Sequence, residues 1–459
     1  MTEAVTHPPP ATSWAAHIRA TVALGLPLIG VQLAQMAIQV TDTLMIGRLG
    51  AEDLAAAVLA TQLFFVAFIF TSGFAHALVP IAAAAASAED PRGVRRAARM
   101  GAWAVTLVAL SLAPVLWSAE AVLLAIDQQP NLAVMAQDYL RIAMWGLFAF
   151  GLVLVFRGFL SALEDAGVVF WATLAAVPLN ALLNWLLIYG SLGAPEMGIR
   201  GAAVASVSSQ ALTLALLVLY CHRSKIIRAY ALFQRIWRPD WPMLGQIFAL
   251  GSGISATLLA EVGLFAATSV MIGWIGTVPL AAHGISLQVV SVIFMIPMGL
   301  SSAATVRAGR ALGRRDAEGL YRAAITVNAL ALGVAVVAAV IFWAVPEPLI
   351  RLFLDAETED AAAIVAYGVP LLAVAALFQL VDTLQVVMLG LLRGIRDIRV
   401  PLGVAVVSYW GIGVPVAYLL GFPLGMGGPG VWLGLLAGLL VAGAAFALRF
   451  HVMSRRVMV

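Results

Sequence analysis

The stretch TLMIGRLGAEDLAA (43–56) recurs later in the chain as SVMIGWIGTVPLAA (269–282), at an offset of 226 residues. Further pairs at the same offset are Gly73 and Gly299, Asp90 and Asp316, and Gly93 and Gly319. A short match between apolar segments arises easily by chance, but a single register that persists over dozens of residues does not. The sequence therefore predicts a duplicated fold, with each half built on the same plan.

The composition places both halves in a lipid bilayer. Of 459 residues, 63% are apolar and only 11% are charged, which is typical of an integral membrane protein. Runs long enough to span fall near 21–46, 54–80, 96–118, 136–160, 167–190, 199–221, 245–274, 280–306, 322–345, 361–391, 400–421 and 430–450. The predicted fold class is an all-α integral membrane protein with twelve transmembrane helices.

The repeat assigns six of these spans to each half. Because six is even, both halves have the same orientation, so the repeat is parallel about an axis along the membrane normal. We expect two pseudo-symmetric six-helix bundles around a central cavity, with FRGF (156–159) in one matching LRGI (392–395) in the other. The predicted parts are an N-terminal tail 1–20, a first lobe 21–221, a linker 222–244, a second lobe 245–450 and a C-terminal tail 451–459.

The basic residues predict the orientation. Of the 26 Lys and Arg residues, only Arg48, Arg141, Arg200 and Arg351 fall in the odd-numbered gaps between spans. The other 22 (26 minus 4) belong to the even-numbered gaps and the two tails. The positive-inside rule then places both termini in the cytoplasm. The N-terminal tail has no short apolar core followed by a small-residue cleavage site, so we expect the first span to remain as an anchor.

Three acids interrupt otherwise apolar spans: Asp42, Glu261 and Asp382. A carboxylate at the middle of a bilayer costs about 2.5–3.5 kcal/mol on insertion scales. Intramembrane acids mark ion and proton pathways for that reason. We therefore expect these three side chains to face a polar cavity and to bind cations or protons.

Other polar side chains accompany the acids at helical spacing. Gln32, Gln35, Gln39 and Asp42 follow one face of the first span, and Gln379, Asp382 and Gln385 follow one face of the tenth. Asn180, Asn184 and Ser206 add oxygen ligands on the fifth and sixth spans. Such side chains either line a cavity or bond helices together. Hard oxygens suit Na⁺ or a proton relay rather than a transition metal, so Na⁺ at Glu261 and Asp382 is the one metal we consider.

Two single residues, His283 and Pro27, each allow two interpretations of their role. His283 lies within the eighth span and is either a satisfied packing residue or a direct proton carrier. Pro27, below the polar stripe, either kinks the first span or acts as a moving hinge. Cys221, the single cysteine, excludes an intrachain disulfide and reads as a buried apolar residue. No phosphate-binding glycine loop, nucleophile elbow or zinc pattern is present, so we expect no enzyme and no cofactor beyond a coupling ion.

Taken together, these motifs resemble the multidrug and toxic compound extrusion (MATE) transporters, and most closely the bacterial NorM type. The resemblance rests on QVTDTLMIGRLGAEDLAA (39–56), LAEVGLFA (259–266), AAHGISLQ (281–288), VDTLQVVMLGLLRGIRD (381–397) and PLNALLNWLLIYGSLGAPEMGIRGAAVAS (178–206). It implies an antiporter of the bacterial inner membrane that exports cationic, amphipathic drugs in exchange for Na⁺ or H⁺. We also expect a monomer, and no nucleic acid as a partner, because the basic residues follow a membrane pattern. Glu261 and Asp382 match the cation-binding acids of the second lobe. Asp42 matches the acid of the first lobe, with Asn180, Asn184 and Ser206 at the neighbouring polar positions.

The sequence departs from this pattern at Phe378, where some sodium-coupled relatives have a tyrosine. The missing hydroxyl weakens the case for Na⁺ and favours H⁺. The main alternative function is a flippase for lipid-linked oligosaccharides of the same superfamily. Such a protein is expected to hold pyrophosphate with several cavity arginines, whereas the spans here contain acids and essentially no Arg or Lys. The missing nucleophile and metal patterns argue against an intramembrane enzyme. The cost of three buried acids argues against a structural or receptor protein that transports nothing.

Overall fold

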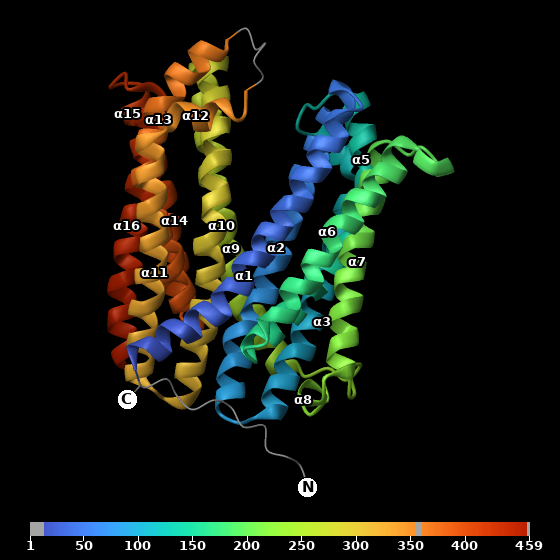
Figure 1. The fold of residues 1–459 in the computed structure, drawn as a ribbon, viewed down its shortest axis with the longest axis vertical. Helices are drawn as coiled ribbons and strands as arrows, with labels where there is room; N and C mark the ends of the chain where they lie inside the picture. Colours follow the sequence, from blue (N-terminus) through green and yellow to red (C-terminus); the bar gives the residue numbers. More distant parts are fainter. Residues whose placement is uncertain (1–12, 355–359, 457–459) are drawn as a thin grey trace. The chain divides into compact units, whose positions relative to one another are not determined.

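The computed structural model describes residues 13–354 and 360–456, and within them the chain is helical with no β-strand. Twelve helices are long and apolar enough to cross a membrane, as predicted. The helices are α1 (Trp14–Gly47), α2 (Ala51–Ser87), α3 (Pro91–Trp117), α4 (Ala119–Leu124), α5 (Pro130–Ala162), α6 (Ala166–Tyr189), α7 (Ile199–Arg223), α8 (Lys225–Arg228), α9 (Trp241–Ile275), α10 (Thr277–Arg314), α11 (Ala317–Ala344), α12 (Pro346–Arg351), α13 (Ala361–Gly394), α14 (Arg399–Val406), α15 (Val414–Gly421) and α16 (Gly427–Arg456) (Figure 1). A 3₁₀ turn, η1 (Ser191–Gly193), follows α6.

The eleventh span is one continuous helix with an irregular centre. Between α14 and α15 the segment η2 (Val407–Gly413) is wound as a π-helix. A π-helical turn accommodates an extra residue and turns the side chains that follow it about the helix axis. Gly438 of α16 faces this segment: a Cβ atom added there would lie 2.9 Å from the Cα atom of Gly413, so α16 and η2 approach each other closely.

The helix starts confirm the register of the repeat. Asp90 and Asp316, at the offset of 226 residues, each accept a hydrogen bond from the backbone N–H three residues on, at 2.9 and 2.7 Å. Both are therefore N-caps of the same kind, for α3 and α11. Gly50 and Gly276 precede α2 and α10 with φ of 145° and 153°, a conformation that only glycine adopts readily.

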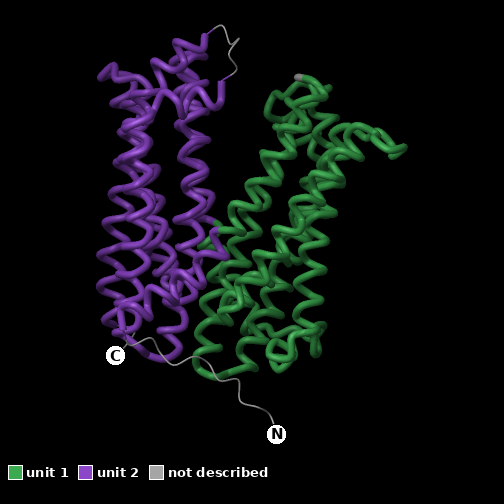
Figure 2. The backbone as a smooth tube through the Cα atoms, viewed as in Figure 1, with its two compact units in different colours: residues 1–8, 30–255 green, residues 9–29, 256–459 purple. Residues whose placement is uncertain are grey.

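The described residues form two compact units, coloured separately in Figure 2. Unit 1 consists of residues 30–255, and unit 2 of residues 13–29, 256–354 and 360–456. The boundaries lie inside helices α1 and α9, whereas the predicted linker was 222–244. Residues 29 and 255 differ by the repeat offset, so each unit takes the first part of one of these helices from the other half of the sequence.

The helices have the same neighbours in both units. In unit 1, α2 packs on α3 and α5, α5 on α7, and α7 on α6. In unit 2, the equivalent helices α10, α11, α13, α16 and α14–α15 contact one another in the same pattern. Each unit buries its own apolar core, which in unit 2 includes Phe378, Trp432 and Phe446. The duplication predicted from sequence is therefore a duplication of packing as well.

Glycines allow the exchanged helix segments to approach closely. In unit 1, Gly73 of α2 lies against the backbone of Ser255, whose hydroxyl donates to the carbonyl oxygen of Phe70 at 2.6 Å. In unit 2, Gly299 of α10 lies against the backbone of Ile29. These two contacts are repeat-equivalent, since Gly73 and Gly299 differ by 226 residues, as do Ile29 and Ser255.

Candidate functional site: acids inside each unit

In unit 1 the carboxylate of Asp42 is held by three donors from two other helices. Asn180 and Asn184, one turn apart on α6, donate to its Oδ1 at 3.0 and 2.5 Å. Ser206 of α7 donates to Oδ2 at 2.6 Å. Asn180 and Asn184 are fully buried, and Asp42 is half-buried. The structure thus gathers the four residues that the sequence analysis grouped in this lobe.

The donors around Asp42 differ in what they allow chemically. The amide N–H groups of Asn180 and Asn184 favour an ionised carboxylate. The hydroxyl of Ser206 both donates and accepts, so by rotating it accommodates a proton on Oδ2. The Oδ1 atom of Asn184 is buried without a hydrogen-bond partner, which leaves a further acceptor at the site. The site is therefore suited to carry either a negative charge or a proton.

The rest of the polar stripe on α1 is divided between different surroundings. Gln32 is buried, and its Oε1 accepts from Nη1 of Arg157 on α5 at 2.7 Å. Gln35 is half-buried and Gln39 is exposed. Gln32 therefore bonds two helices together, as one of the two readings of the stripe expected, while Gln35 stays a candidate for the polar lining.

In unit 2, Glu261 of α9 and Asp382 of α13 lie close enough for their charges to interact. Asp382 is 2% exposed, and its Oδ1 has no hydrogen-bond partner. Gln379 and Gln385, one turn to either side of it, are fully buried, and their Oε1 atoms also lack partners. A group of buried oxygens without donors is costly unless a cation or a proton joins them.

Two residues that the sequence analysis did not assign to this site complete it. Tyr409, in the π-helical segment η2, is fully buried and accepts a hydrogen bond from Nε2 of Gln385 at 2.6 Å. Arg393, in the last turn of α13, lies within electrostatic range of both Glu261 and Tyr409. Trp410 donates from Nε1 to the carbonyl oxygen of Ala260 at 3.1 Å, which fixes η2 against the turn that carries Glu261.

The expectation that the interiors of the spans contain essentially no Arg or Lys is wrong. Arg157 lies inside α5 and is 8% exposed, and Arg393 lies inside α13. Both belong to the repeated FRGF and LRGI motifs, which the count of basic residues assigns to the gaps between spans. Within the described residues, no guanidinium forms an ion pair within 4.0 Å of Asp42, Glu261 or Asp382.

Phe378 and His283 belong to an aromatic cluster beside the acids. The ring of Phe378 packs edge-on against Phe265 and Trp432, with centroids 6.0 and 5.5 Å away. His283 accepts at Nδ1 from Trp432 at 3.1 Å, and its Nε2 lies 2.9 Å from the hydroxyl of Ser269. Because the indole N–H can only donate, Nδ1 carries no proton and His283 is neutral here. These contacts match the packing reading of His283.

The fold and the acid sites together define a class of protein. It is a helical membrane protein with a parallel internal repeat and an acid site buried in each unit, which is the architecture of a membrane transporter. A family model for MatE matches residues 27–186 and 254–419, covering most of both halves. The chain belongs to the MATE family.

Named relatives agree with this assignment. A probable multidrug resistance protein NorM of Rhizobium meliloti is 49% identical over 97% of this chain and 95% of its own length. A protein of the same name from Agrobacterium fabrum is 46% identical over 99% of this chain and 98% of its own. The branch is therefore the NorM type that the sequence motifs indicated.

Solved structures share the fold at much lower identity. A eukaryotic MATE transporter superposes with a TM-score of 0.84 at 21% identity, covering 97% of this chain and 99% of the other. An outward-facing multidrug resistance MATE family transporter superposes with a TM-score of 0.85 at 19% identity, over 96% of each chain. The twelve-helix fold is thus retained where little of the sequence is.

Proposed function

We propose that this protein is a cation-coupled antiporter that exports cationic, amphipathic compounds across the bacterial inner membrane by alternating access. The observation that carries this proposal is the acid site of unit 2. Glu261 and Asp382 interact through their charges, Asp382 is almost completely buried, and no ion pair satisfies either acid among the described residues. The relatives named for multidrug resistance support the export of drugs.

The charge balance supports a monovalent coupling ion. With both acids ionised, Glu261 and Asp382 contribute two negative charges and Arg393 one positive charge, which leaves a net charge of −1. One Na⁺ or one H⁺ neutralises the site, and a neutral buried site is far cheaper than a charged one. The buried Oε1 atoms of Gln379 and Gln385 provide hard oxygen ligands for Na⁺ in addition.

Tyr409 bears on the choice of ion. The sequence lacks a hydroxyl at Phe378, but the hydroxyl of Tyr409 lies among the same charges, in electrostatic range of Glu261, Asp382 and Arg393. We therefore assign to Tyr409 the hydroxyl that Phe378 cannot supply, and Na⁺ remains as suitable as H⁺.

Exchange follows from competition for negative charge. An organic cation and the coupling ion each remove the cost of a buried carboxylate, so each weakens the binding of the other by the same factor. Asp42, with its three donors, is the equivalent group in unit 1. Pro27 lies two residues before the boundary between units in α1 and, as a predicted hinge, lets that helix change its bend during the cycle.

The flippase alternative finds less support. Its ligand is a pyrophosphate, which calls for several free arginines in the interior of the spans, where the acids lie. Arg157 is already engaged by Gln32, and Arg393 lies near Glu261. The acid sites favour a cationic cargo instead.

The test is transport by the full-length protein in proteoliposomes. Efflux of a fluorescent organic cation is driven in turn by a sodium gradient alone and by a proton gradient alone, which identifies the coupling ion. Glu261→Gln and Asp382→Asn should each reduce gradient-driven efflux to the level of empty liposomes while leaving the thermal unfolding midpoint nearly unchanged. Glu318→Gln, a change at a side chain 65% exposed in the same unit, is the matched control. Full efflux by both acid variants would refute the assignment.

A further inference from the structure

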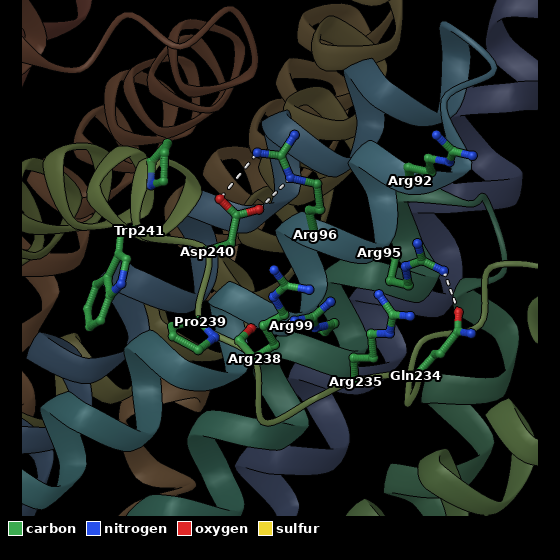
Figure 3. Close-up of a pocket in the computed structure, with 11 residues that line it drawn as sticks. Arg92, Arg95, Arg96, Arg99, Gln234, Arg235, Arg238, Pro239, Asp240 and Trp241 are labelled. Atoms are coloured by element: carbon green, nitrogen blue, oxygen red, sulfur yellow. Dashed lines mark hydrogen bonds and ion pairs between the residues drawn. The ribbon is translucent and has the colours of Figure 1, made fainter.

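Unit 1 contains a second polar cluster, which shares no residue with the Asp42 site. Six arginines surround a cavity of about 640 Å³, which we call the arginine basin. Four belong to the first turns of α3 and two to the segment that precedes α9: Arg92, Arg95, Arg96, Arg99, Arg235 and Arg238. Figure 3 shows these six arginine side chains together with Gln234, Asp240 and Trp241, which also line the cavity. The distribution of basic residues assigns this end of the unit to the cytoplasm.

The basin is built by helical spacing and by a fixed loop. Residues 92, 95, 96 and 99 follow the i, i+3, i+4, i+7 pattern and so share one face of α3. The loop that carries Arg235 and Arg238 is tied to this helix by two side chains. Trp103 donates from Nε1 to the carbonyl oxygen of Ile236 at 2.8 Å, and Arg99 donates from Nη2 to that of Arg238 at 2.5 Å.

Among the described residues, one carboxylate lines the basin. Asp240 forms an ion pair with Arg96 and accepts a second hydrogen bond from its Nη2 at 3.2 Å. The Arg96 guanidinium holds the pKa of the Asp240 carboxyl below its usual range, so Asp240 is ionised at neutral pH. Six positive charges and one negative charge leave a net charge of +5.

Most of the guanidinium groups in the arginine basin have N–H donors that no acceptor in the described part of the protein occupies. Arg95 donates to Oε1 of Gln234 at 3.0 Å, but the Nε atoms of Arg95 and Arg99 are buried without hydrogen-bond partners. Within the described residues, the side chains of Arg92, Arg235 and Arg238 make no hydrogen bond or ion pair. The charges of Arg95, Arg235 and Arg238 all repel that of Arg99, and among the described residues Asp240 is the one carboxylate that acts on Arg99 in the opposite sense.

We propose that the arginine basin binds a phosphate group, carried by an anionic phospholipid headgroup or by a small phosphorylated molecule. Planar guanidinium groups match phosphate oxygens in paired hydrogen bonds, and several together are the usual way in which proteins hold such a group. Basic pockets at the cytoplasmic ends of transmembrane helices bind lipid headgroups in the same manner.

Membrane topology alone does not account for the basin. The repeat places Glu318, Tyr321, Arg322 and Ile325 of α11 at the positions of Arg92, Arg95, Arg96 and Arg99. The equivalent helix thus begins on the same side of the membrane with one arginine at these positions in place of four. The fold and its orientation are therefore compatible with a much weaker charge, and the basin is a local addition to unit 1.

The apolar surroundings favour a lipid as the source of the phosphate. Trp241, which lines the basin, is 68% exposed, and Trp237 and Ile226 nearby in sequence are 73% and 63% exposed. Tryptophan with its ring exposed beside basic residues is typical of the bilayer interface, where the ring meets headgroups. A phospholipid would place its phosphate among the arginines and its chains along such side chains.

The experiment uses the purified full-length protein in a neutral detergent at fixed ionic strength. Binding of a fluorescent short-chain phosphatidylglycerol is measured by titration, with unlabelled short-chain phosphatidylglycerol, phosphatidylcholine and inorganic phosphate as competitors. The test variant is Arg235→Gln with Arg238→Gln, because both side chains are exposed and unbonded and the Arg99 hydrogen bond uses only the backbone of residue 238. The control is Arg455→Gln with Arg456→Gln, two exposed arginines that the same rule places on the cytoplasmic side.

Each arginine near a membrane surface contributes about fivefold to the affinity for an anionic lipid, so the test variant should bind about 25-fold more weakly than the wild type. The control should bind within about twofold. Competition by phosphatidylglycerol but not by phosphate identifies a lipid site, and competition by both identifies a site for soluble phosphorylated molecules as well. Equal affinity of the test and control variants, or equal competition by phosphatidylcholine, would overturn the proposal, and unchanged dye efflux in the same variants would leave the antiport proposal standing.

Discussion

Tyr409 shows how a single hydroxyl can be placed where the sequence pattern does not foresee it. The hydroxyl oxygen accepts from Gln385, so its own proton remains available to donate to a neighbouring carboxylate or to be turned away from a bound cation. Its ring is held by η2, and the next residue, Trp410, anchors that segment to α9. Phe378, by contrast, is enclosed by aromatic rings and contributes only apolar surface.

Tyr409→Phe tests this role at the scale of one atom. The ring packing stays, but the hydroxyl is lost from a site with interacting charges, so we expect the apparent affinity for the coupling ion to fall about tenfold. The measurement is the cation concentration, or the pH, that gives half-maximal efflux in proteoliposomes. Tyr189→Phe removes a comparable hydrogen bond, from the hydroxyl to the carbonyl oxygen of Met45 at 2.6 Å in unit 1, and should leave that affinity unchanged. The same shift in both variants would mean that Tyr409 acts only through stability.

At the scale of helices, the close crossings of α1 with α10 and of α9 with α2 hold the exchanged segments in place. A Cβ atom added at Gly299 would lie 2.7 Å from the backbone nitrogen of Ile29 and 2.8 Å from its Cα. A Cβ atom added at Gly73 would lie 2.5 Å from the backbone nitrogen of Ser255. Backbone atoms cannot move aside as a flexible side chain does, so the helices themselves would have to separate.

Gly73→Ala and Gly299→Ala should therefore each destabilise the protein by about 1–3 kcal/mol, the usual cost of overpacking. Gly333→Ala is the control, because a Cβ atom there meets no heavy atom within 4 Å and an alanine is the better helix former. Thermal unfolding in detergent compares the three variants. A loss at only one of the two crossings would show that the repeat-equivalent contacts do not contribute equally.

At the scale of the whole molecule, the orientation in the membrane decides which end of each unit meets the cytoplasm. Of the 26 Lys and Arg residues, 22 (26 minus the four of the odd-numbered gaps) lie in the even-numbered gaps, in the helix ends beside them or in the tails. This distribution places both termini on one side of the membrane, which requires an even number of crossings. Twelve of the described helices are long enough to span, and twelve is even.

Cysteine labelling in intact cells tests this orientation. Cys221 is buried and is the only cysteine, so Cys221→Ala provides a clean background. In it, Glu196→Cys should react with a membrane-impermeant thiol reagent in intact cells, whereas Lys225→Cys should react only after lysis, because the positive-inside rule places the two on opposite sides. Both side chains are exposed in the structure, so access to the thiol is not limiting. The opposite labelling pattern would invert the proposed topology.

The sequence by itself determined the number of helices, their repeat and the acids inside them. These features depend on the transfer free energy of each segment and on local spacing, and both can be read along the chain without knowing what lies beside it. The grouping of Asp42 with Asn180, Asn184 and Ser206 had a different source, the resemblance to the family motifs, because these residues lie on three separate helices.

Only the tertiary structure decided which side chains meet across helices. It brought Tyr409 and Arg393 to the acids, paired Arg157 with Gln32, and laid the loop with Arg235 and Arg238 over the arginines of α3. These meetings depend on how each helix is rotated about its axis and on where a π-helical turn inserts an extra residue. No local pattern encodes either quantity, because both are set by the packing of segments far apart in the chain.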